Sequence, residues 1–89
     1  MQRQLGKKNE TNNNLNKSLA ILNKAIQMDS ADEQSYSERA EVFEGLGELE
    51  SAISDLERLL ALSTWEFELD RTRRKIEKLR ISREAREKE

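Results

Sequence analysis

The chain contains no cysteine, no proline and no histidine among its 89 residues. Without cysteine it can form neither disulfide bonds nor a thiolate nucleophile, and without histidine it lacks the commonest general base and a frequent metal ligand. Aromatic residues make up only 4% of the chain and charged residues 38%, a composition that favours uninterrupted helices over sheets. We therefore expect an all-α protein that is not an enzyme and that holds no cofactor or metal.

Long hydrophobic runs are also absent. The longest is Leu59-Leu60-Ala61-Leu62, far shorter than the roughly 20 residues that a membrane-spanning helix requires. We expect a soluble, cytoplasmic protein, with the nucleus as the alternative location if the basic residues after position 70 act as a localisation signal.

Charge is plentiful but segregated along the chain. Residues 29–70 carry 13 acidic and 2 basic side chains, whereas residues 1–28 and 71–89 are both net basic. This pattern has two interpretations. The basic ends could attract the acidic middle within one molecule, or the acidic middle could attract a basic partner over a long range.

The two ends of the chain differ in their apolar pattern. Residues 1–14 are polar and have no apolar stripe, so we expect them to be disordered. Leu15, Leu19, Leu22 and Ile26 step by four, three and four, which predicts a helix that ends near residue 29.

The last apolar stripe predicts another helix, and the helical domain as a whole then spans residues 15–81. Its side chains, spaced four, three, four and three apart, are Trp65, Leu69, Thr72, Ile76 and Leu79. Beyond this helix, residues 82–89 are expected to form a charged, solvated tail.

Between these segments, two helical stripes flank Gly47. The first is Tyr36, Ala40 and Phe43, and the second is Leu49, Ala52, Ile53, Leu56 and Leu59. Glycine tolerates the left-handed backbone that ends many helices, so Gly47 predicts a reversal of the chain. The small side chains of Ala40 and Ala52 predict that the two helices cross closely at these positions.

These residues resemble the tetratricopeptide repeat, a two-helix unit of about 34 residues. The signature positions, on a repeat at about 33–64, are Tyr36, Ala40, Phe43, Leu46, Gly47, Ala52, Leu56 and Leu59. A preceding half-repeat places Ser18, Leu22 and Ala25 on second-helix positions. Departures are Leu59 for the usual alanine, Ser30 and Thr64 for the closing prolines, and Arg39 beside Ala40. The last helix does not continue the register, so the resemblance implies an amphipathic capping helix there.

The resemblance also implies a function, because the first helix of such a repeat lines a groove that binds a peptide or helix of a partner protein. The groove positions carried over by register are Gln34, Ser37, Glu38, Glu41 and Glu44. Chaperone-binding members grip an acidic tail with an asparagine at the position of Glu38, so the carboxylate here disfavours that role. We expect an adaptor or scaffold module that binds a basic or polar segment.

A second surface supports an alternative function. The basic residues of the last helix are Arg71, Arg73, Arg74, Lys75, Lys78, Arg80 and Arg83. Such density can bind nucleic acid or an anionic membrane through phosphate contacts, but no stacking aromatics are interleaved with these residues. A solvated face is the simpler interpretation.

One and a half repeats are fewer than the roughly three that such arrays need for independent stability. We therefore expect either a longer array or a partner that covers the exposed end. The face in question contains Leu15, Leu19 and Leu22, so self-association through these residues is a prediction.

Overall fold

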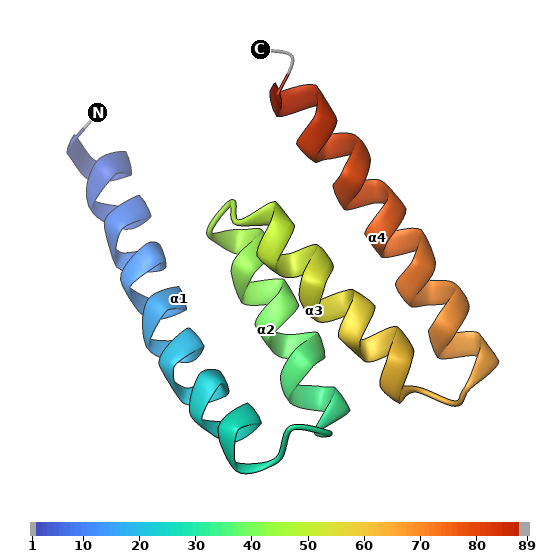
Figure 1. The fold of residues 1–89 in the computed structure, drawn as a ribbon. Coiled ribbons are helices and arrows are strands. Elements are labelled where there is room, and N and C mark those ends of the chain that lie inside the picture. Colours follow the sequence, from blue (N-terminus) through green and yellow to red (C-terminus); the bar gives the residue numbers. More distant parts are fainter. Residues whose placement is uncertain (1, 88–89) are drawn as a thin grey trace.

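The computed structural model describes residues 2–87, with side chains from Glu10 onward, and every regular element in this part of the chain is a helix. The helices are α1 (Gln2–Met28), α2 (Glu33–Gly45), α3 (Leu49–Leu62) and α4 (Glu66–Glu87). They run alternately in opposite directions, and each packs on the next one along the chain (Figure 1). The all-α prediction is therefore confirmed.

The molecule is a thin slab, only 19 Å across in its shortest direction. Because one helix with its side chains is about 10–12 Å wide, this thickness accommodates about two helices. Each helix therefore keeps a large face in contact with solvent. None of the helices within residues 2–87 combines the length and the hydrophobicity needed to cross a membrane.

The centre of the fold is the hairpin of α2 and α3. Ala40 and Ala52 are both fully buried, which allows the two helices to approach closely at these positions. The second predicted stripe is also confirmed, since Ile53, Leu56 and Leu59 are buried in the same cluster. From α4, Ile76 and Leu79 complete this core.

Gly47 ends α2 and reverses the chain. It has a φ of 79°, the only positive φ among the described residues. The amide of Gly47 donates to the carbonyl of Glu44 at 3.1 Å, and the amide of Glu48 donates to the carbonyl of Phe43 at 2.8 Å. These two bonds form a Schellman motif, which satisfies carbonyls that would otherwise be free at the end of α2.

A polar cluster around Arg39 connects three helices. Its Nε and Nη2 donate to the two carboxylate oxygens of Asp55 on α3 at 2.7 and 2.6 Å, and its Nη1 donates to Asn23 Oδ1 on α1 at 3.0 Å. The guanidinium also lies 5.6 Å from the centre of the Tyr36 ring and 5.7 Å from that of Phe43. The hydrogen bond to Asp55 raises the pKa of Arg39 above its ordinary value despite the opposing effect of burial, so Arg39 remains charged.

The ends of the chain differ from the prediction. Residues 2–14, expected to be disordered, belong to α1, and residues 82–87, expected to form a solvated tail, belong to α4; Met1 and residues 88–89 lie outside the described residues. An existing helix gains one hydrogen bond for each residue it adds, and no proline interrupts it, so a helix can continue where its apolar stripe has ended. In addition, Arg86 in the last turn of α4 donates to the carbonyl of Gly47 at 2.9 Å.

The left-handed conformation of Gly47 makes a testable prediction. We expect Gly47→Ala to lower the free energy of unfolding by about 1–2 kcal/mol, because other residues adopt this conformation only with strain. Its added Cβ would also meet Arg86 Nη1 at 3.4 Å. The control is Gly45→Ala inside α2, where the helix preference of alanine opposes a 3.1 Å contact with the flexible Leu15 side chain. Urea denaturation showing equal losses for both variants would contradict this account of the turn.

A second prediction concerns the Arg39–Asp55 pair. The Asp55 side chain is only 6% exposed, so Asp55→Ala leaves the Arg39 charge without its main partner. We expect a loss of about 2–3 kcal/mol in the free energy of unfolding. The matched control, Glu57→Ala, removes an exposed ion pair with Arg80 and should cost about 0–1 kcal/mol. Similar losses in the two variants, measured by the same denaturation, would show that the buried pair has no special role.

Candidate functional site

The predicted groove residues form one strip along the outer side of α2. We call Gln34, Ser37, Glu38, Glu41 and Glu44 the acidic strip. Ser37 is half-buried and the other four are exposed. Their position follows from the packing of α2, because Tyr36 and Ala40 are turned into the protein and buried and residues three or four apart share a helix face.

The carboxylates of the acidic strip are not equivalent. Lys75 of α4 lies 4.0 Å from Glu41 and 3.7 Å from Glu44, measured between Nζ and the nearest carboxylate oxygens. Glu38 instead accepts a hydrogen bond from Gln34 Nε2 at 3.2 Å. Two of the three carboxylates of the strip therefore already face a cation of the same molecule, although these ion pairs are long and exposed and contribute little to stability.

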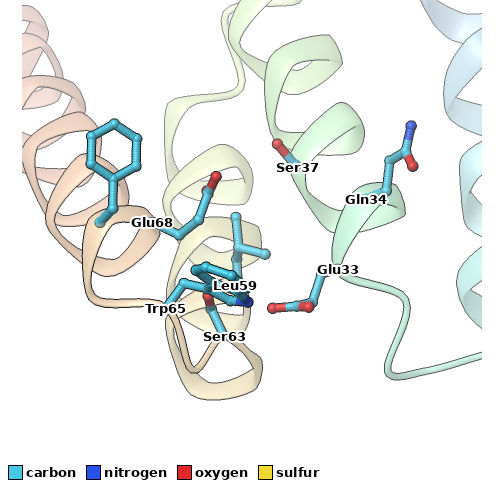
Figure 2. Close-up of a pocket in the computed structure, with 8 residues that line it drawn as sticks. Glu33, Gln34, Ser37, Leu59, Ser63, Trp65 and Glu68 are labelled. Atoms are coloured by element: carbon cyan, nitrogen blue, oxygen red, sulfur yellow. The ribbon is translucent and has the colours of Figure 1, made fainter.

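One hollow borders the beginning of α2. It has a volume of about 430 Å³, and we call it the aromatic hollow. Its lining comes from α2, the end of α3 and the beginning of α4: Glu33, Gln34, Ser37, Leu59, Ser63, Trp65, Phe67 and Glu68. Figure 2 shows Ser37 and Glu68 turned toward the space between α2 and α4, with Trp65 near Leu59. Gln34, which also lines the hollow, is turned toward the other side of α2.

The exposure of Trp65 differs from the prediction made from the sequence. It was expected to begin the apolar stripe of the last helix, but its side chain is 73% exposed, whereas Thr72, Ile76 and Leu79 are buried as predicted. The physical reason is that α4 begins at Glu66. Trp65 therefore precedes the helix and does not share its periodicity. Phe67, which the sequence analysis did not single out, is 76% exposed.

The two acidic residues of the aromatic hollow are also absent from the predicted site. Glu33 lies in the first turn of α2 and Glu68 in the first turn of α4. Neither has an ion pair or a side-chain hydrogen bond with any residue of the described part of the chain. The sequence signal that could have found Glu68 is the alternation Trp65-Glu66-Phe67-Glu68 at a predicted helix start, whereas no comparable local signal marks Glu33.

A second hollow, of about 480 Å³, lies between α1 and α2. Its lining is Leu15, Ser18, Ile21, Leu22, Glu38, Glu41 and Val42. The face predicted to be bare is partly covered here, since Leu22 is buried and Leu15 and Leu19 are half-buried. The coverage comes from α2, on which α1 packs. Ile21, at 70% exposure, is the most exposed apolar side chain of this hollow.

The basic residues of α4 have mixed surroundings. Lys75, Arg80 and Arg83 form ion pairs with acidic residues of α2 and α3, and Arg73 pairs with Asp70 inside α4. Arg71 and Arg74 line a small hollow of about 230 Å³ with Phe67 and Asp70. Lys78 is exposed. The interpretation in which the basic end attracts the acidic middle within one molecule therefore applies to Lys75, Arg80 and Arg83 of α4.

The described residues contain no group of three or more acidic side chains arranged to hold a metal ion. No protein-family model, curated protein or solved structure matches the chain. The candidate functional site of the described residues is the acidic strip together with the two hollows that border it.

Proposed function

We propose that the protein is an interaction module that binds a basic or polar segment of a partner protein along the acidic strip of α2. The observation that carries this proposal is the position of the strip between two hollows, one shared with α1 and one with α3 and α4. A peptide or helix lying on α2 could place charged side chains on the strip and apolar side chains in the hollows. This is the usual division of labour in a peptide groove.

The tetratricopeptide interpretation supports the same surface. The two-helix unit reverses at Gly47 and has fully buried alanines at both signature positions, Ala40 and Ala52. Tyr36 is buried, and its hydroxyl donates to the carbonyl of Ser30 at 3.0 Å, so it supports α2 from behind the strip. In this interpretation α4 is a capping helix, and the outer side of α2 is the binding face.

Charge determines which partner suits this face. The exposed carboxylate of Glu38 would repel the acidic tails that chaperone-binding relatives of such repeats recognise, so that role is disfavoured. A basic segment gains attraction at Glu38 and can compete with Lys75 for Glu41 and Glu44, because those ion pairs are exposed. An adaptor for basic segments is the better-supported role.

Nucleic-acid or anionic-membrane binding through α4 is the alternative. Its basis is Arg71, Arg74 and Lys78, which form no ion pair within the described residues. Binding of this kind falls steeply with salt and should be lost in the Arg73→Glu, Arg74→Glu double variant. Binding along the acidic strip should survive that change.

The proposal predicts the effect of reversing charge on the strip. In Glu38→Lys, Glu41→Lys, two like charges would face a basic segment, and we expect captured partners to fall at least tenfold in affinity. The control, Glu77→Lys, Glu84→Lys, makes the same change of charge at exposed positions of α4. The measurement is quantitative pull-down with the intact chain and both variants. The proposal fails if the two variants lose the same partners to the same extent.

Lys75 supplies a prediction of the opposite sign. Lys75→Gln removes the cation that competes for Glu41 and Glu44, so a basic partner recovered in the pull-down should bind a few-fold more tightly to this variant. Titration calorimetry with the purified partner measures the change. Weaker binding to Lys75→Gln would mean that Lys75 itself contacts the partner and that the strip is not the site.

A further inference from the structure

We propose that the aromatic hollow binds an arginine side chain of the partner segment, with the guanidinium over the Trp65 indole and within reach of Glu33 and Glu68. This inference rests on the proposed function, because it names the chemistry that one end of the binding face recognises. Its basis is independent of the acidic strip, since Trp65, Phe67, Glu33 and Glu68 all lie outside that strip.

The first argument comes from the aromatic side chains. Trp65 and Phe67 are 73% and 76% exposed, and they line the same hollow. An indole is the best natural face for a cation, and it buries a large area when a flat group stacks on it. A hollow lined by two exposed aromatic rings is a stronger indication of an interaction site than a single exposed ring.

The second argument comes from charge. Glu33 and Glu68 approach the hollow from different helices, and neither has a cationic partner in the described part of the chain. Lys75 is engaged with Glu41 and Glu44, about two turns further along α2 than Glu33. Arg71, which lies near Phe67, forms no ion pair with either acidic residue of the hollow. The hollow therefore combines unpaired negative charge with exposed aromatic faces.

Side chains other than arginine would match either the aromatic rings or the carboxylates of the hollow, but not both. An apolar side chain would cover the rings but would also remove water from the two carboxylates without replacing their hydrogen bonds. An acidic side chain would be repelled. Lysine offers a point charge, whereas the planar guanidinium of arginine stacks on an indole and donates to carboxylates at the same time. A hollow of about 430 Å³ also has room for one long side chain together with water.

The test uses the fact that Trp65 is the only tryptophan of the chain, so its fluorescence reports on this hollow alone. The probe is a short, unstructured glycine–serine peptide that carries arginines. Its control is the same peptide with citrulline, which keeps the shape of arginine but not its charge. We expect a saturable change of Trp65 emission with the arginine peptide and at least tenfold weaker binding of the citrulline peptide. Equal responses to the two peptides would overturn the inference.

Matched variants locate the effect. Glu33→Gln, Glu68→Gln removes the two charges of the hollow and should weaken the arginine peptide about tenfold. The control, Glu48→Gln, Glu66→Gln, removes two exposed charges that do not line the hollow and should bind as the intact chain does. Circular dichroism of each variant establishes that the helices are retained. Equal weakening in the two double variants would show that only net charge matters and would overturn the assignment.

This test can fail without the proposed function failing. If pull-down still depends on Glu38 and Glu41 but the arginine peptide leaves Trp65 unchanged, the strip binds partners and the hollow does not select arginine. If the arginine peptide binds as expected but the strip variant captures partners normally, the proposed binding face is wrong and the hollow acts alone. A change in Trp65 emission with protein concentration, without peptide, would assign the hollow to a second copy of the chain and contradict our choice of occupant.

Discussion

The close packing of α2 on α3 is the constraint on which the rest of the structure depends. Ala40 and Ala52 leave no side-chain bulk at the crossing, and both are fully buried. The Arg39–Asp55 pair then fixes how α2 is rotated about its own axis, because its bidentate geometry permits little sliding. With one face of α2 committed to α3 and α1, the opposite face, which carries Glu38, is left to solvent.

The rotation of α2 about its axis determines which of its acidic residues face the basic residues of α4. The basic residues of α4 could have formed an independent cationic surface, but several of them face acidic residues of α2 and α3, as Arg83 faces Glu50. Each such pair contributes little alone. Together they leave the aromatic hollow, with Glu33 and Glu68, as a place where negative charge meets exposed aromatic rings and no internal cation is paired with it.

The sequence predicted the hairpin because its signals are local. Helical spacing and the glycine at position 47 depend on neighbours along the chain, and the observed helices follow them. The Arg39–Asp55 pair was not predicted because its partners are 16 residues apart and meet only after the hairpin forms. The exposure of Trp65 was missed for a related reason. Whether it joins the apolar stripe depends on the residue at which α4 begins, and helix boundaries are the least predictable feature of a sequence.

The central claim is that a basic partner lies on the outer side of α2 and inserts an arginine into the aromatic hollow. The most direct measurement is the mapping of backbone amide NMR shifts in the intact chain as the arginine-bearing peptide is added. The account predicts that the largest changes cluster at residues 33–38 and 65–68, which border the hollow. Changes confined to the basic positions 71–83 of α4, or to residues 15–22 of α1, would contradict it.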